Sequence, residues 1–110
     1  MNDLAQRGPL GQKVKPIRGT AAAKAHMARI AELRCVVCLR PGPSEVHHCI
    51  CGRFGQAKAS DFDTIPLCFD CHRGPEGIHA NKTLWVDRNG PDTDFLPLVR
   101  DILAGEWNEP

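Results

Sequence analysis

Apolar residues follow a helical spacing in some segments of the chain and form short continuous runs in others. Residues 20–33 are rich in strong helix formers, and Met27, Ile30 and Ala31 lie on one stripe of the helix they predict. Thr20 is placed to cap its first turn. We therefore expect a helix here that leads directly to the first cysteine pair.

Two more helices are predicted in the second half of the chain. One spans residues 79–88 and ends at the Asn-Gly-Pro sequence of residues 89–91. The other spans residues 94–104, presents apolar side chains on one face and stops at Gly105. Pro97 fits this last helix only in its first turn.

Residues 45–50 and 64–67 form short, partly β-branched runs that could be the strands of a hairpin. The loop between them, residues 52–63, contains glycine and basic side chains. Because helices flank this hairpin on both sides, the pattern predicts a small α+β fold.

Composition shows that such a fold needs support beyond its apolar core. The chain has 110 residues, of which 42% are hydrophobic, but it contains only four Phe, two Trp and no Tyr. A chain of this length forms one domain and buries about two-thirds of its unfolded surface. A bound metal ion would add folding free energy, and six Cys and five His are available as ligands.

Charge is distributed unevenly, although the net charge is only +1. Residues 1–30 carry six basic side chains and one acidic one, a net charge of +5, whereas residues 86–110 carry two basic and six acidic ones, a net charge of −4. We interpret residues 1–19 as a flexible basic arm, because they lack apolar periodicity. Such an arm suits contact with a nucleic-acid backbone, although charge alone fits a solvated tail equally well. The basic residues assigned to this contact are Lys13, Lys15 and Arg18.

No apolar run approaches the roughly 20 residues that cross a bilayer, and the first residues lack the apolar centre of a secretory signal. We therefore expect a cytoplasmic protein without membrane contact. Disulfides are rare in that reducing compartment, so the cysteines are interpreted first as metal ligands.

Cys35 and Cys38 form one closely spaced pair, and Cys68 and Cys71 form a second pair, with 29 residues between the two. Four thiolates in tetrahedral geometry suit a structural zinc ion, whose closed shell leaves no position for catalysis. Redox dithiols are the alternative, but neither pair lies in a thioredoxin-like strand-to-helix unit. The remaining cysteines are interpreted as spare thiols, with entry of one into the zinc shell as the alternative; they are Cys49 and Cys51.

Three histidines lie on the segments that this zinc ion would bring together. His47 and His48 are adjacent on the first predicted strand, and His72 directly follows the second cysteine pair. Adjacent residues of a strand face opposite sides. One of the pair can therefore ligate a metal ion while its neighbour serves as a base, which points to a functional site.

The sequence EVHH at residues 45–48, then DTIPLC at residues 63–68 and Cys71-His72, resembles the HNH, or His-Me finger, endonucleases of the zinc-ribbon type. Among these, residues 55–61 and the Gly-Ile-His sequence of residues 77–79 are similar to the phage recombination-enhancement nucleases that act with RecA. The resemblance covers roughly residues 30–90.

The resemblance implies a ββα-metal finger built on the four-cysteine zinc pair, closed around one catalytic divalent cation, Mg²⁺ or Mn²⁺. His47 and His72 would ligate this cation, and His48 would be the general base that deprotonates a water for attack on a DNA phosphodiester. The products would carry a 5′ phosphate and a 3′ hydroxyl. The implied partners are DNA and a recombinase filament such as RecA, and the implied source is a phage or prophage in a bacterial host.

Two departures from the family pattern affect the remaining roles. Where many HNH nucleases have a central Asn, this chain has Asp63, whose carboxylate can hold the tautomer of His48. Asp61 competes for that role. Gly-Pro at residues 74–75 interrupts the helix that usually carries the last ligand, so we expect His79 as the third ligand, with a phosphate contact or a surface position as alternatives.

The resemblance thus implies a nuclease domain over residues 20–110, with its core at about residues 33–90. Arg53 and Lys58, in the loop between the strands, are expected to contact phosphate. The alternative function is a non-catalytic zinc-ribbon module that binds nucleic acid or protein.

Overall fold

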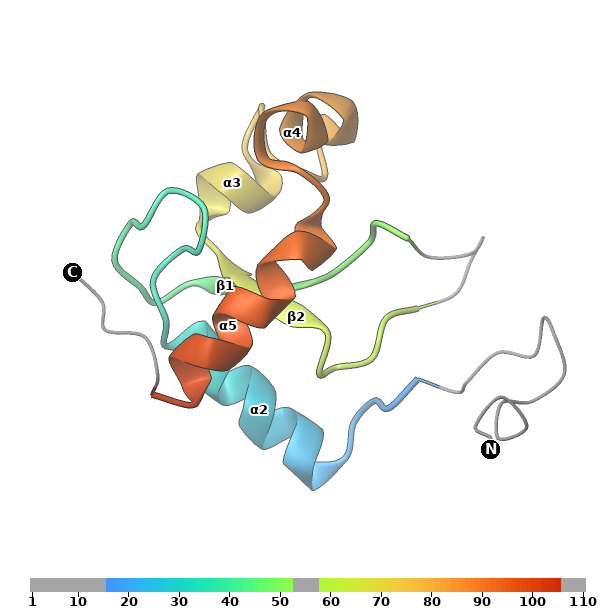
Figure 1. Cartoon of the computed structure of the whole chain (residues 1–110), viewed down its shortest axis with the longest axis vertical. Helices are drawn as coiled ribbons and strands as arrows, with labels where there is room; N and C mark the ends of the chain where they lie inside the picture. Colours follow the sequence, from blue (N-terminus) through green and yellow to red (C-terminus); the bar gives the residue numbers. More distant parts are fainter. Residues whose placement is uncertain (1–15, 53–57, 106–110) are drawn as a thin grey trace, which may run out of the picture.

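The computed structural model describes residues 16–52 and 58–105, which form a small α+β fold around one hairpin (Figure 1). The α+β class predicted from the sequence is confirmed. In chain order the elements are α2 (Ala21–Ala31), β1 (Glu45–His48), β2 (Thr64–Leu67), α3 (Phe69–Arg73), α4 (Lys82–Asn89), the 3-10 helix η1 (Asp92–Phe95) and α5 (Leu96–Leu103).

The two strands pair antiparallel, as the sequence predicts, although β1 ends at His48 and not at residue 50. His47 lies opposite Ile65 and His48 lies opposite Thr64 in this register. The outer edge of β2 also forms a hydrogen bond: the amide of Val36 donates to the carbonyl of Pro66, with an N–O distance of 3.0 Å. This bond ties the first cysteine turn to the sheet.

Helix α2 confirms the predicted first helix. The Thr20 side chain accepts a hydrogen bond from the amide of Ala23 at 3.0 Å, and the helix then runs to Ala31. Ile30 is fully buried in the core. The guanidinium of Arg29 donates to the carbonyl of Leu103 at 2.7 Å, which joins the ends of α2 and α5.

The later helices are shorter than the sequence predicts. Helix α4 begins only at Lys82, because the Asn81 side chain caps it by accepting a hydrogen bond from the amide of Leu84 at 3.1 Å. The last helix is divided into η1 and α5, with Pro97 in the first turn of α5. Helices α4 and α5 are each followed by a glycine with positive φ, Gly90 at 85° and Gly105 at 80°.

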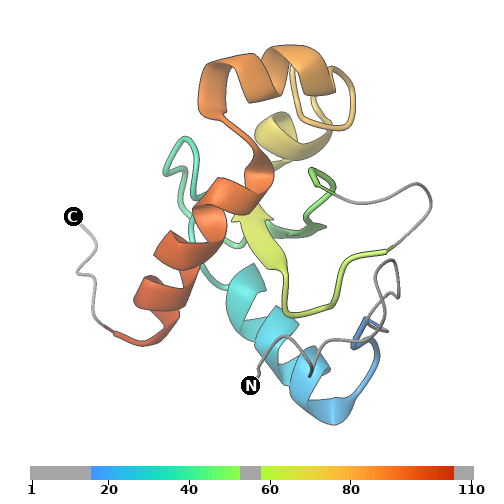
Figure 2. The same ribbon diagram turned by 45° about the vertical axis from the view of Figure 1, so that its right-hand side comes forward.

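The hairpin separates two groups of helices: α3 and α4 lie at the end of the molecule opposite α2 in both Figure 1 and Figure 2. One apolar core spans these parts and includes Ile30, Ile65, Leu67, Trp85 and Val99, all buried. No helix within residues 16–52 and 58–105 is long and apolar enough to cross a membrane.

Candidate metal centres and the His48–Asp61 pair

The four cysteines predicted to hold zinc gather at one point. The Sγ atoms of Cys35, Cys38, Cys68 and Cys71 all lie within 4.8 Å of one another. Sulfurs about 2.3 Å from a tetrahedral zinc ion are separated by about 3.8 Å, and the Cys38 and Cys68 sulfurs lie 3.6 Å apart. The donor set and its spacing therefore fit a zinc ion.

Backbone amides support the first sulfur of each pair. The amide of Cys38 donates to the Sγ of Cys35 at 3.5 Å, and the amide of Cys71 donates to the Sγ of Cys68 at 3.4 Å. Hydrogen bonds of this kind stabilise a thiolate. The two turns thus have the same local geometry, although one follows α2 and the other joins β2 to α3.

Cys49 and Cys51 lie outside this group, in agreement with their interpretation as spare thiols. Cys49 belongs to the buried core. Burial, with the nearby carboxylates of Asp92 and Asp63, raises the pKa of the Cys49 thiol to about 12. A thiol with so high a pKa stays protonated and unreactive at neutral pH.

A second group consists of three histidines from three segments. One ring nitrogen each of His47, His72 and His79 lies within 4.8 Å of the others. The ring centroids are 4.7 to 5.1 Å apart, and the Nε2 atoms of His72 and His79 are separated by 3.1 Å. The structure thus brings these three imidazoles together, and their role as ligands of one cation stays a prediction.

His47 is oriented toward this group by a buried carboxylate. Its Nε2–H donates to Oδ2 of Asp92 at 2.8 Å, and both side chains are fully buried. Burial alone would raise the pKa of Asp92, but the bonds from His47 and from the amides of Ile50 and Cys51 hold it at about 2. Nδ1 of His47 is buried and has no hydrogen-bond partner among the described residues. A buried imidazole nitrogen without a partner, beside two other imidazoles, could ligate a metal ion.

His72 is held in a similar way by Glu45. Its Nδ1–H donates to a carboxylate oxygen of Glu45 at 2.7 Å, so that its Nε2 lone pair is left for the histidine group. Arg73 binds the same carboxylate, and together the two bonds lower the pKa of Glu45 to about 2. Burial lowers the pKa of His72, which favours the neutral imidazole that ligates metals.

His79 reaches the group although the helix before it ends early. Helix α3 stops at Arg73, and the chain then turns back, so that the amide of Ile78 donates to the carbonyl of Cys71 at 3.0 Å and that of His79 to His72 at 3.2 Å. A Cβ atom at Gly77 would lie 2.7 Å from the backbone carbon of His72. Only glycine allows this close return, which replaces the interrupted helix.

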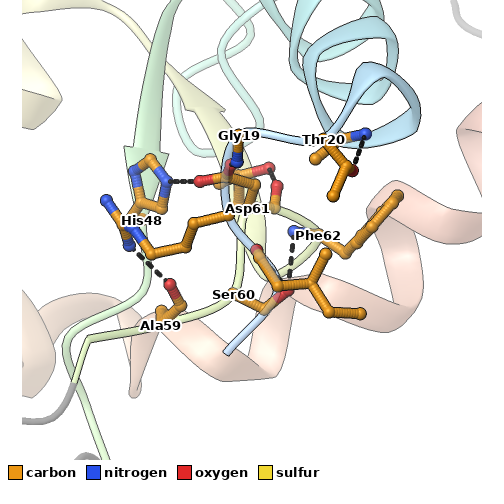
Figure 3. A network of polar contacts seen from close by, with 11 residues as sticks. Gly19, Thr20, His48, Ala59, Ser60, Asp61 and Phe62 are labelled. Atoms are coloured by element: carbon orange, nitrogen blue, oxygen red, sulfur yellow. Dashed lines mark hydrogen bonds and ion pairs between the residues drawn. The ribbon is translucent and has the colours of Figure 1, made fainter. Parts of the chain in front are cut away.

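His48 faces the other side of β1 and forms a separate pair. Its Nε2 lies 2.7 Å from Oδ1 of Asp61, and Figure 3 shows this carboxylate between His48 and Gly19. The His48 side chain is 29% exposed, whereas that of Asp61 is 5% exposed. Hydrogen bonds from His48 and from the amide of Gly19 lower the pKa of Asp61. The carboxylate is therefore ionised at neutral pH and accepts the His48 Nε2–H.

Asp63 does not hold His48, so our preference for Asp63 over Asp61 is wrong. Asp63 directly precedes β2, and its carbonyl accepts a hydrogen bond from the amide of Cys49 at 3.0 Å. Its carboxylate lies 3.6 Å from the guanidinium of Arg100 on α5. The family pattern places this residue five positions before Cys68, at Asp63, but the turn before β2 brings Asp61 to His48.

The predicted DNA contacts are only partly within the described residues. Lys58 is exposed, as a phosphate contact requires. Arg18 is exposed and donates to the carbonyl of Ala59 at 2.7 Å. The others, Lys13, Lys15 and Arg53, lie outside the described residues.

Two supporting residues were not predicted from the sequence. Glu45 stands in the sequence EVHH but was given no role, and Asp92 lies 45 residues beyond His47. Glu45 lies two residues before His47 on β1, so the two side chains share one face of the strand. This alternation could have identified Glu45 as a supporting residue only once His72 of α3 was known to lie opposite that face. Comparisons with known protein families, curated proteins and solved structures found no match to this chain.

Proposed function

We propose that this chain is a metal-dependent DNA endonuclease with an HNH-type ββα-metal site. One observation carries the proposal: two adjacent histidines of β1 belong to two different polar arrangements. His47 joins a convergent group of imidazoles, while His48 pairs with a carboxylate and stays accessible. Metal-dependent phosphodiester hydrolysis needs a bound cation and a general base next to it, and these two arrangements could supply both.

The base in this proposal is Nδ1 of His48. Because Nε2–H is donated to Asp61, the lone pair of the neutral ring lies on Nδ1, where it can accept a proton from water. Asp61 stabilises the imidazolium that forms and keeps the ring in one orientation. The partial exposure of His48 leaves room for water and a phosphodiester to approach.

The cation site would consist of Nδ1 of His47, Nε2 of His72 and Nε2 of His79. Imidazole nitrogens suit first-row transition metals, whereas Mg²⁺ prefers oxygen ligands. Of the two cations expected from the family, the donor set therefore favours Mn²⁺ over Mg²⁺. When bound, the cation would neutralise charge on the scissile phosphate and on the leaving oxygen.

Exposed basic side chains beside the His48–Asp61 pair support DNA as the substrate. Arg18 and Lys58 border the segment that carries Asp61, and phosphate contacts of this kind bind DNA without reading its sequence. Specificity would then come from a partner, and a recombinase filament such as RecA is the partner that the resemblance suggests.

A plasmid-nicking assay tests the proposal. Wild type and His48→Ala are compared on supercoiled DNA with Mn²⁺, with Mg²⁺ and with excess EDTA. We expect cation-dependent nicking by wild type and a loss of about 10²- to 10⁴-fold in His48→Ala, the usual contribution of a general base. Equal nicking by the two proteins, or none by a wild type that holds both metal ions, would contradict the proposal. Tight DNA binding without nicking would favour the zinc-ribbon binding module instead.

A further inference from the structure

The segment before α2 contacts the residues that hold His48. The amide of Asp61 donates to the carbonyl of Ile17 at 2.8 Å, and Oδ2 of Asp61 accepts the amide of Gly19 at 2.7 Å (Figure 3). Arg18 adds its bond to Ala59, and the hydroxyl of Ser60 donates to Ile17 at 3.3 Å. Two segments more than 40 residues apart in sequence are therefore joined directly beside the proposed base.

The two carboxylate oxygens of Asp61 accept hydrogen bonds from two different segments of the chain. Oδ1 of Asp61 accepts from the His48 ring, and Oδ2 accepts from the Gly19 backbone. The carboxylate is 5% exposed, so water competes little for either oxygen. The direction in which Asp61 presents Oδ1 to His48 is consequently fixed by the position of Gly19.

The conformation of Gly19 is what allows this contact. Its φ is +77°, in the left-handed region that favours glycine, and a Cβ atom placed there would meet no atom of residues 16–52 and 58–105 within 4 Å. A side chain at this position would therefore act through backbone conformation alone and not through a clash. Thr20 follows as the cap of α2, so the same turn also starts the helix.

We propose that residues 17–19 are a positioning segment of the nuclease site, which fixes His48 in its productive tautomer and orientation through Asp61. The inference rests on the proposed function for its catalytic consequence, but not for its structural one. Residues 17–19 do not touch the reacting atoms in this proposal; they act through another side chain.

The test compares Gly19→Ala with Gly105→Ala in the full-length chain. Both glycines have positive φ, at +77° and +80°, and no atom of the described residues lies within 4 Å of a Cβ added at either position, so the two substitutions introduce comparable backbone strain at different places. We expect Gly19→Ala to lower kcat for plasmid nicking about 5- to 30-fold, the cost of forcing alanine into this conformation. KM should stay within about twofold because no charge changes, and Gly105→Ala should leave both constants within about twofold.

Nitrogen NMR of the His48 ring gives a second readout that does not depend on activity. In the neutral ring, wild type should carry its proton on Nε2, and Gly19→Ala should shift the neutral ring toward a mixture of tautomers. An unchanged His48 spectrum in folded Gly19→Ala would overturn the inference even if wild type proves to be inactive. Equal effects of Gly19→Ala and Gly105→Ala on kcat would also overturn it.

Ser60→Ala provides an independent variant if Gly19→Ala does not fold. It removes the hydroxyl that bonds Ile17 and the amide of Phe62 and changes no charge. We expect a smaller loss of kcat in the same direction, about twofold to fivefold, which corresponds to the one neutral hydrogen bond to Ile17 that joins the two segments. Wild-type kcat with a wild-type His48 spectrum in this variant would overturn the inference.

Discussion

Asp92 holds His47 from 45 residues further along the chain, with its Oδ2 2.8 Å from Nε2 of the imidazole and both side chains fully buried. This contact decides which nitrogen of His47 faces the other two histidines. Because the carboxylate accepts Nε2–H, the lone pair lies on Nδ1, which has no hydrogen-bond partner within the part of the chain that the structure describes. Asp92 also accepts two backbone amides, so the fold itself sets its position.

Substitution of Asp92 should therefore weaken the histidine site. Asp92→Asn keeps the shape but lowers the basicity of His47, and we expect the affinity for Mn²⁺ to fall about 10- to 100-fold, as for other supporting partners of metal ligands. The free Mn²⁺ signal in electron paramagnetic resonance measures this affinity. Asp94→Asn is the matched control, since Asp94 lies in the same turn and is exposed. Equal Mn²⁺ affinities of the two variants would show that Asp92 does not support the site.

The four-cysteine group should be required for folding. Cys35→Ser or Cys68→Ser removes one sulfur from the set, and we expect loss of the zinc ion and of cooperative thermal unfolding, because metal binding supplies much of the folding free energy of a small domain. Cys51→Ser should retain one zinc ion and unfold as wild type does. Elemental analysis and circular dichroism distinguish these outcomes. A folded, zinc-free Cys35→Ser protein would exclude a structural zinc site here.

Asp61 and Asp63 should differ sharply in their effect on nicking. Asp61→Asn replaces the carboxylate that stabilises the His48 imidazolium, and we expect kcat to fall by at least about 10-fold, although by less than the 10²- to 10⁴-fold that loss of the whole base would cost. Asp63→Asn loses only a surface contact with Arg100 and should stay within about twofold. The same plasmid assay measures both variants. A larger loss in Asp63→Asn would reinstate the assignment made from the sequence.

The close return of the chain at Gly77 should be required for His79 to ligate. In Gly77→Ala the added Cβ would overlap the backbone of His72, and we expect a destabilisation of about 1–3 kcal/mol as the segment moves away. Mn²⁺ affinity should fall while the zinc content stays at one ion per chain. Unchanged Mn²⁺ affinity in this variant would mean that His79 is not a ligand.

Much of this architecture follows from local sequence signals. Thr20 before a run of helix formers, the paired cysteines and the histidines next to them predict α2, the cysteine group and the histidine group. These signals lie within a few residues of one another, or depend on ligand types that have few other uses. Local spacing is therefore sufficient to predict them.

The contacts that local spacing could not predict are the long-range ones. Asp92 bonds to His47 of β1, and Gly19 bonds to Asp61, the partner of His48. Nothing near Asp92 or Gly19 in the sequence indicates these partners. Residue spacing favours Asp63 over Asp61 as the partner of His48, but the turn before β2 places Asp61 beside the imidazole. Such choices depend on how the hairpin and its neighbours pack, which a single sequence does not encode locally.

Anomalous X-ray diffraction from crystals grown with zinc and then soaked in Mn²⁺ would show whether the cysteine group and the histidine group hold separate ions. We expect two separate peaks: zinc at about 2.3 Å from the sulfurs of the cysteine group, and manganese bound by the histidine group. Nδ1 of His47 should be among the manganese ligands, with Asp92 still on the opposite nitrogen. A single peak at the cysteines, with no ion bound by His47, would contradict the proposed nuclease site.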